Sequence, residues 1–276
     1  MKKIGVIGKN TYSDGLFAIY LSLCSYIIYA EKCGYVPVVD LKHYQNQYFK
    51  DNREYRDNTW EYFFQQPAKI TLDEIPTDSD IKIFGSNDYM VNESISFLPN
   101  DLPKSPNKPA NIKYEKEFFN KLKFQPEIEN FLTESTRSIL GNEKNVLGIL
   151  YRGTDYLALK PYGHAIQPNI DDVIQKIIEY KEKYNINKIF IATEDLCAYE
   201  KFKQKFGDMI IDNPQYKIET KQSKRYLSEI INDESTIRKD HSYKLGKEYL
   251  RSIYILSKCK YFIGGRTYGT IAVYLL

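Results

Sequence analysis

An arginine at the end of an apolar run is the first residue here whose type suggests chemistry. The run Val146–Tyr151 leads directly onto Arg152 and Gly153, and Asp155 follows two residues later. Glycine and aspartate suit a turn, but a turn does not require arginine. The planar guanidinium group can grip phosphate oxygens through paired hydrogen bonds. We therefore expect Arg152 either to bind an anion or to pair with Asp155.

A glycine-rich stretch near the end of the chain has the complementary chemistry. The residues that we predict to hold an anion there are Gly265, Arg266, Thr267, Tyr268, Gly269 and Thr270. Glycines allow the backbone to approach a ligand, and a helix predicted to begin near Thr267 would offer free N–H groups and the positive end of its dipole. Threonine hydroxyls could add further donors. Together with Arg152 this stretch predicts a diphosphate site; the alternative is an ordinary turn that needs its glycines.

Several other residues are candidates for binding or proton transfer. Thr193, Glu194 and Asp195 follow another apolar run, where they could contact a donor molecule or cap the next helix. Asp155 and His164 are candidate general bases, His164 because it lies in a loop after the arginine. Asp14 and Gly15 are further candidates for binding in the first part of the chain. His43 and His241 show no comparable context.

The elements that must position these residues alternate in type. A β-branched run at 3–8, an apolar stretch at 16–33 and a second β-branched run at 35–40 predict a strand, a buried helix and a strand, with Asp14 as a cap of that helix. The second half repeats this alternation more regularly. Such alternation predicts an α/β fold with open parallel sheets, in which ligands bind beyond the carboxyl ends of the strands.

The order of these elements suggests two domains. We expect an N-terminal α/β domain at 1–110, linking helices at 111–142 and a C-terminal α/β domain at 143–276. The proline-rich segment 98–110 supports the first boundary. Because the sequence stops inside an apolar helical pattern without a polar cap, we expect the C-terminal domain to be truncated.

Composition excludes some classes of function. The net charge is only +3, which does not predict a nucleic-acid partner. The apolar run 16–30 is short for a transmembrane helix, so we expect a cytoplasmic protein without a transmembrane segment, peripheral membrane association being left open. The four cysteines form no CxxC pair, and Asp78-Ser79-Asp80 fits a turn better than a metal site. We therefore expect no metal.

The second half resembles the GT-B fucosyltransferase superfamily of α1,6-, α1,2- and protein O-fucosyltransferases. The stretch 150–155, LYRGTD, is similar to the motif H-x-R-x-(T/G)-D, and ATED at 192–195 and LSKCKYFIGGRTYGTIA at 256–272 are similar to two later blocks. In the first half, NTWEYFFQQP at 58–67 looks like bacterial surface-polysaccharide glycosyltransferases. The resemblance implies two Rossmann-like domains with parallel sheets facing a cleft. It implies that the domain at 1–110, with Asp14 and Gly15, is on the acceptor side and that the domain at 143–276 binds the nucleotide sugar. It also implies inverting, metal-independent transfer, with GDP-fucose as donor, a glycan as acceptor and no further cofactor.

The resemblance implies roles for some residues of this chain, whereas at other positions the residue typical of the family is replaced. It implies that Arg152 holds the β-phosphate and that Thr267, Tyr268 and Gly269 hold phosphate. The histidine and the aspartate that help to bind guanine in the family are replaced by Leu150 and Ser252. A candidate catalytic glutamate of the α1,6 enzymes is replaced by Lys160. Two alternatives therefore stay open: a transferase that uses another nucleotide sugar, and a non-catalytic protein that binds nucleotide sugars or glycans.

Overall fold

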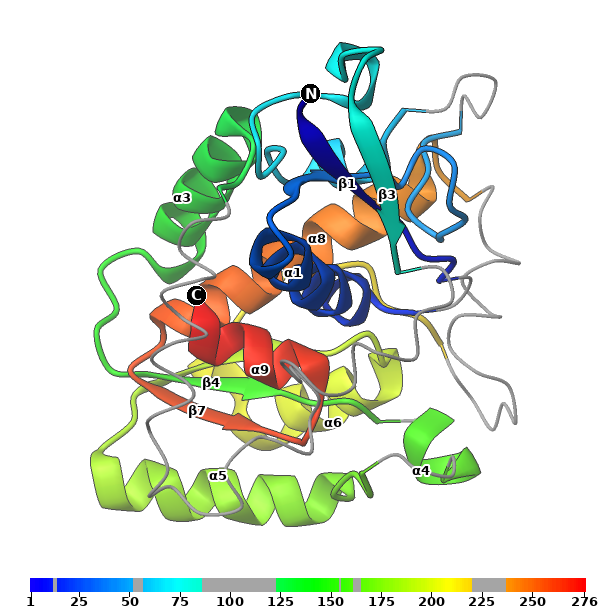
Figure 1. Cartoon of the computed structure of the whole chain (residues 1–276). Helices are drawn as coiled ribbons and strands as arrows, with labels where there is room; N and C mark the ends of the chain where they lie inside the picture. The colour runs from blue at the N-terminus through cyan, green and yellow to red at the C-terminus, as the bar shows by residue number, and fades with distance from the viewer. Residues whose placement is uncertain (12–13, 52–56, 86–122, 154, 161–164, 220–236) are drawn as a thin grey trace. The chain divides into compact units, whose positions relative to one another are not determined.

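The computed structural model describes residues 1–11, 14–51, 57–85, 123–153, 155–160, 165–219 and 237–276 (Figure 1). These divide into two compact units, which we describe separately. Unit 1 comprises Met1–Glu129, Arg238–Tyr243 and Leu275–Leu276, and unit 2 comprises Asn130–Ile237 and Lys244–Tyr274. The proline-rich segment 98–110 and a helix expected at 114–123 lie outside the described residues, apart from Lys123.

Unit 1 contains a parallel three-stranded sheet in the order β2-β1-β3. Its strands are β1 (Lys3–Ile7), β2 (Val36–Val39) and β3 (Asp80–Phe84), and helix α1 (Leu16–Lys32) connects the first two. The helix is apolar on most of its surface and 12 of its residues are buried, which explains the long apolar run in the sequence. The predicted strand, helix and strand are therefore confirmed.

Glycines lie at both ends of α1. Gly34 follows the helix with φ +78°, a left-handed conformation that glycine adopts without strain. At the other end, Gly15 is the N-cap residue and no side chain caps the helix. The prediction that Asp14 caps α1 was wrong, because Asp14 lies one position before the cap.

The segment after β2 is mostly irregular. Between residues 42 and 66, the described residues contain one short 3₁₀ helix, η2 (Thr59–Tyr62). Buried Asn58 holds this segment, since its side-chain oxygen accepts from the N–H of Leu41 at 2.9 Å and its amide donates to Val39 O at 2.6 Å. A second 3₁₀ helix, η3 (Leu72–Glu74), precedes β3.

Unit 2 contains a second parallel sheet, in the order β6-β5-β4-β7. Its strands are β4 (Val146–Leu150), β5 (Lys188–Ala192), β6 (Ile210–Ile211) and β7 (Tyr261–Gly264). The helices of this part of the chain are α3 (Pro126–Leu140), α4 (Asp155–Leu159), α5 (Ile170–Tyr184), α6 (Leu196–Phe206), α8 (His241–Lys258) and α9 (Tyr268–Leu275), with η5 (Gly207–Met209) before β6. Helices α3 and α8 begin in unit 1.

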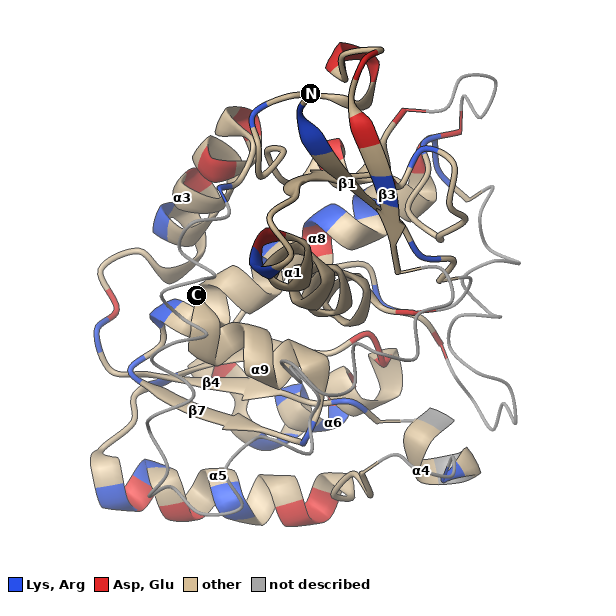
Figure 2. Ribbon diagram, in the orientation of Figure 1, with Lys and Arg blue, Asp and Glu red and all other residues tan. Residues whose placement is uncertain are grey.

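Helices cover both faces of this sheet. Leu147 and Ile149 point to the face packed by α5 and α6, in one core with Ile177 and Phe202. Gly148 points to the opposite face, where the side chain of Leu256 on α8 leaves no room for a β-carbon. Figure 2 shows β4 and β7 without charged residues and α5 with charges of both signs. The two parallel sheets and their helices confirm the predicted α/β fold.

Candidate functional site

The strand ends that the sequence singled out lie side by side in unit 2. Leu150, the last residue of β4, pairs with Ala192 of β5 on one side and with Gly264 of β7 on the other. One step further, the N–H of Tyr151 donates to Ala192 O at 3.0 Å. The three loops that follow these strands therefore begin at the same edge of the sheet.

The strand order identifies which two loops enclose the ligand position of this sheet. The chain runs from β4 outward to β5 and β6, and then returns to add β7 on the other side of β4. In open α/β sheets, ligands bind at the carboxyl edge where the order reverses in this way. Here that point lies between β4, which leads to Arg152, and β7, which leads to Gly265.

Arg152 lies beside one aromatic ring, and its charge acts on the hydroxyl group of a second aromatic residue. Its guanidinium carbon lies 4.4 Å from the ring centre of Tyr156 on α4, a cation–π geometry that restricts the side chain. Burial raises the pKa of Tyr249 on α8, the charge of Glu194 raises it further, and the charge of Arg152 opposes the shift. Arg152 and Glu194 therefore both act on the hydroxyl of Tyr249.

The glycine-rich turn after β7 is fixed by its own threonines. Thr267 Oγ1 accepts from the N–H of Thr270 at 3.2 Å, which caps α9. The hydroxyl of buried Thr270 donates to Gly265 O, so it closes the turn. The first N–H groups of α9, at Tyr268 and Gly269, lie at the positive end of that helix, where an anion is stabilised.

Two residues that the sequence did not single out pack against this turn. The side-chain amide of Gln167 occupies the space beside the Gly265 Cα, and its Nε2 donates to Arg266 O at 3.4 Å. The hydroxyl of Tyr249 occupies the corresponding space beside Gly269. No local sequence pattern indicates either residue, because the two contacts join positions about 100 and about 20 residues apart along the chain. The periodicities of strands and helices, two and 3.6 residues, predict contacts only between residues that are close in sequence.

The loop after β5 is mainly structural. Asp195 caps α6, since its Oδ1 accepts from the N–H of Ala198 at 3.0 Å, and its own N–H donates to Thr193 Oγ1 at 3.2 Å. Asp195 and Thr193 are buried. Of the two functions left open for Asp195, capping is confirmed. Glu194 is half-buried. Of these three residues, it is the one whose charge affects the pKa of Tyr249, as the charge of Arg152 does.

A buried polar cluster surrounds the position of Ser252. The Asn213 amide donates to Ser252 Oγ at 3.1 Å and to Ile191 O of β5 at 3.1 Å, and the Ser252 hydroxyl donates to Gln215 Oε1 at 2.9 Å. Ser252 and Asn213 are fully buried. The serine is therefore engaged inside unit 2 and presents no carboxylate to a base.

The remaining candidates are outside this arrangement. His164 and the side chain of Asp155 lie outside the described residues, although the backbone of Asp155 begins α4. Asp14 and Gly15 belong to unit 1, where Asp14 is exposed and its carbonyl accepts from Gln47 Nε2 at 2.7 Å. Among the described residues, no three His, Cys, Asp or Glu side chains gather as metal ligands. In the same part of the chain, no helix combines the length and apolarity that a membrane span needs.

Solved structures that are similar to this chain include fucosyltransferases. NodZ α-1,6-fucosyltransferase soaked with GDP-fucose matches with a TM-score of 0.55 at 16% identity, over 100% of this chain and 93% of that chain. POFUT1 in complex with GDP matches with a TM-score of 0.56 at 9% identity, over 99% and 94%. An Arabidopsis thaliana FUT1 mutant, R284K, in complex with GDP matches with a TM-score of 0.51 at 12% identity, over 98% and 68%.

The similarity is one of fold. A scan against protein-family models gave no match, and neither did a search of curated proteins. At 9–16% identity the structural matches establish the GT-B fucosyltransferase fold for this chain. They confirm the resemblance first suggested by the stretch around Arg152.

Proposed function

We propose that this chain is an inverting glycosyltransferase that moves a sugar, fucose in the first instance, from a nucleoside diphosphate to a hydroxyl group of a glycan. The observation that carries the proposal is the position of Arg152 and the α9 N-terminus on the two sides of the strand-order reversal in unit 2. The fold supports it, because NodZ soaked with GDP-fucose and POFUT1 in complex with GDP have a similar fold. We further propose a cytoplasmic enzyme of bacterial surface-polysaccharide synthesis.

The proposed reaction requires the protein to stabilise a leaving diphosphate. As the bond between the anomeric carbon and the phosphate oxygen breaks, the electron pair stays with the nucleoside diphosphate and its negative charge grows. Arg152 would bind a β-phosphate oxygen through its guanidinium group, and the N–H groups of Tyr268 and Gly269 would bind others. Each such interaction is stronger with the departing phosphate than with the intact donor, and so it accelerates the reaction.

Recognition of the base is a separate matter. Leu150 is apolar and packs beside Gly269, and Ser252 is enclosed by Asn213 and Gln215. Neither offers the hydrogen bonds that the histidine and aspartate of the resembling family supply to guanine. This observation favours a second candidate function: the same transfer from a sugar nucleotide with a base other than guanine. A non-catalytic sugar-nucleotide-binding protein is the third.

Thermal unfolding in the presence of nucleotides tests the proposal. A ligand that binds the folded state raises Tm by mass action. We expect a diphosphate to raise it, and comparing GDP, UDP and ADP, with CMP as a monophosphate reference, identifies the base. Arg152→Ala should weaken diphosphate binding about 10- to 100-fold, the value of one or two charge-assisted hydrogen bonds. Arg137→Ala, which removes an exposed arginine of α3, is the matched control.

Two outcomes would contradict the proposal at different levels. If Arg152→Ala binds every diphosphate as tightly as the parent, the site is wrong. If the parent binds a nucleoside diphosphate but releases none from GDP-fucose or UDP-sugars, with glycans or with water, the non-catalytic function is correct.

A further inference from the structure

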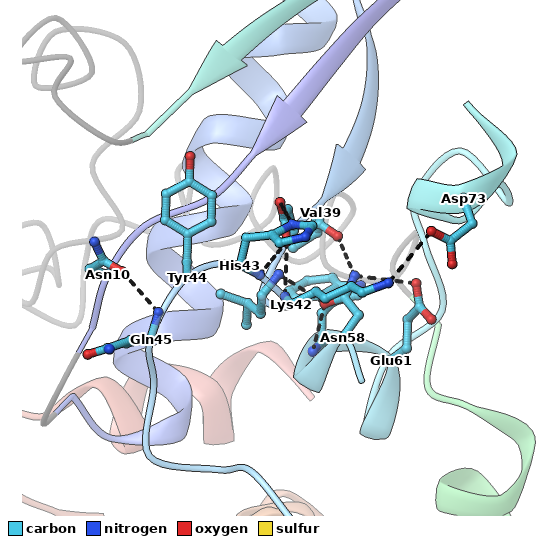
Figure 3. Close-up of polar contacts among 12 residues, drawn as sticks. Asn10, Val39, Lys42, His43, Tyr44, Gln45, Asn58, Glu61 and Asp73 are labelled. Atoms are coloured by element: carbon cyan, nitrogen blue, oxygen red, sulfur yellow. Dashed lines mark hydrogen bonds and ion pairs between the residues drawn. The ribbon is translucent and has the colours of Figure 1, made fainter. Parts of the chain in front are cut away.

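The two edges of the unit 1 sheet differ in how their backbone groups are paired. β2 forms one edge, and Pro37 and Val39 face away from β1 because successive residues of a strand direct their N–H and carbonyl groups to opposite sides. Proline has no N–H group. The N–H of Val39 donates to Gln66 Oε1 at 2.8 Å, and its carbonyl accepts from the Asn58 amide at 2.6 Å (Figure 3). At Pro37 and Val39, this edge therefore has no N–H donor left for another strand.

The opposite edge, formed by β3, is open. The N–H of Asp80 donates to Lys2 O at 2.8 Å, so Asp80 faces β1 and, by alternation, Ile81 and Ile83 face away from it. Within the part of the chain that the structure describes, no residue forms a hydrogen bond with the N–H or the carbonyl group of either isoleucine. This edge of the sheet can therefore accept a further strand.

The side chains of the two isoleucines are also exposed. Ile81 is 53% exposed and Ile83 is 55% exposed. The ring of Phe84 packs edge-to-face on Tyr29 of α1, with 5.9 Å between the ring centres, so the isoleucines of β3 point to the face opposite α1. Unpaired backbone groups beside exposed apolar side chains are a template for pairing with another chain. The edge of β3 thus has the features of an interaction surface.

The simpler interpretation is that Lys82 keeps this edge unpaired, because a lysine on an edge strand can prevent association. Lys82 is exposed, and its Nζ lies 5.2 Å from the ring centre of Phe84 on the same strand. Asp80, two positions earlier, lies on the same face of the sheet as Lys82. One face of the strand therefore carries a negative and a positive charge in succession, a pattern that can complement itself when two copies run in opposite directions.

We propose that β3 pairs in antiparallel orientation with β3 of a second copy of this chain. Ile81 lies on the two-fold axis, opposite Ile81 of the second copy, and Asp80 lies opposite Lys82 of the second copy. The N–H and carbonyl groups of the two Ile81 residues bond to each other, and the N–H of Ile83 reaches the carbonyl group of Ser79. The proposal is independent of the proposed glycosyltransferase function.

Charge selects this register. If Ile81 were opposite Ile83 of the second copy, the backbone groups would also pair, but Lys82 would lie opposite Lys82, and like charges in direct opposition are destabilising. In the proposed register, both direct pairs on the face toward α1 join a carboxylate to an ammonium group. Because the two-fold axis uses the same surface on both copies, the contact closes as a dimer.

A charge swap tests the pairing. The association of the full chain is measured by sedimentation velocity and light scattering at increasing protein concentration, and we expect a concentration-dependent dimer. Asp80→Lys or Lys82→Asp alone places like charges opposite each other on both sides of the axis, and should weaken the dimer about 10-fold. The double variant Asp80→Lys/Lys82→Asp restores both pairs and should restore the parental dimer. Glu31→Lys, which reverses an exposed charge of α1, is the matched control.

Ile81→Pro tests the backbone contact. It removes an N–H group that faces the second copy and leaves the hydrogen bonds between β1 and β3 in place, because proline is tolerated on the open side of an edge strand. The variant loses two hydrogen bonds per dimer, so dimerisation should weaken about 10- to 100-fold. Its Tm, measured at a concentration at which the parent is a monomer, should stay close to that of the parent.

Single cysteines test the register. The background is Cys33→Ser, which removes an exposed thiol. Residues directly opposite each other in an antiparallel pair have Cα atoms about 4.5–5.5 Å apart, within the range of a disulfide. Ile81→Cys should therefore link two copies under mild oxidation. Lys82→Cys should not, because the two copies of residue 82 lie opposite residue 80 and not opposite each other.

A parent that is monomeric at every concentration overturns the proposal. Slow hydrogen exchange at Ile81 and Ile83 in such a monomer would show that another part of the same chain covers the edge. A dimer that Ile81→Pro leaves intact, or single charge reversals that the double variant does not rescue, places the interface elsewhere and also overturns the proposal. A disulfide through Lys82→Cys without one through Ile81→Cys overturns the register.

Discussion

The hydroxyl group of Tyr249 occupies the space into which a side chain on Gly269 would have to extend. Tyr249 belongs to α8 and Gly269 to the first turn of α9. The same hydroxyl is influenced by the charges of Glu194 and Arg152. One half-buried tyrosine thus links the glycine-rich turn to the strand end that leads to the arginine.

Gly269→Ala tests this link, because two effects oppose each other there. Alanine is favoured over glycine in a helix by about 1 kcal/mol, so propensity alone predicts a more stable protein. The new methyl group would overlap the Tyr249 hydroxyl and press on Leu150, and we expect this overlap to dominate, at about 1–3 kcal/mol. Thermal unfolding should show a lower Tm, and diphosphate binding should weaken.

The double variant Gly269→Ala/Tyr249→Phe supplies the control. Removing the hydroxyl oxygen relieves the overlap with the methyl group, so part of the lost Tm and binding should return. A single variant that is as stable and binds as tightly as the parent would show that α9 can shift freely, and the turn would then be less rigid than we infer.

Ser252→Ala tests whether the buried polar cluster is structural. Without the hydroxyl group, the Asn213 amide and Gln215 Oε1 lose a buried partner, which costs about 1–3 kcal/mol. Urea unfolding measures the loss. The matched control is Ser257→Ala on the same helix, since the Ser257 hydroxyl donates only to Tyr254 O of its own helix, and its loss should cost about 0.5 kcal/mol or less. Equal losses in the free energy of unfolding for the two variants would contradict a stabilising function of the buried polar cluster.

Asp195→Asn separates capping from donor binding. Asparagine caps a helix about as well as aspartate, whereas alanine forfeits about 1 kcal/mol. If Asp195 serves only α6, Asp195→Asn should keep the Tm and the diphosphate affinity of the parent, and Asp195→Ala should lose stability. Weaker binding by a stable Asp195→Asn would mean that the carboxylate also acts on the ligand.

Tyr199→Phe should have an effect that depends on pH. The Tyr199 hydroxyl donates to Asp212 Oδ1 at 2.8 Å. Burial first, and then Asp212, raises the pKa of Tyr199 to about 12. A raised pKa favours the neutral phenol in the folded state. Its contribution to stability is therefore complete below the ordinary tyrosine pKa of about 10 and is lost as pH rises through about 12.

The measurement is the free energy of unfolding of the parent and of Tyr199→Phe at pH 8 and at pH 11.5. The parent should be more stable at pH 8, by about 1 kcal/mol for one hydrogen bond. The difference should shrink at pH 11.5. A constant difference across this range would contradict the raised pKa.

The sequence alone was sufficient for the local elements and for the choice of the residues from which a phosphate site is proposed. Strands 146–150 and 188–192, the glycine-rich turn and the arginine that follows a strand are local patterns, because side-chain periodicity and turn chemistry involve residues close along the chain. The resemblance around Arg152 agreed with that chemistry. The α/β fold followed from the alternation of the elements.

Only the tertiary structure decided which residues meet. The order β6-β5-β4-β7 places the strand that leads to Arg152 beside the strand that leads to Gly265, although 113 positions separate these residues, and it depends on packing of the two sheet faces. The same is true of Tyr249 at Gly269 and of Asn213 at Ser252. The pairing of His43 with Asp40 is only three residues long, yet it requires the irregular turn after β2, which has no periodicity to reveal it. Burial, irregular turns and non-local contacts leave no periodic pattern in the sequence, so only the structure shows these neighbours.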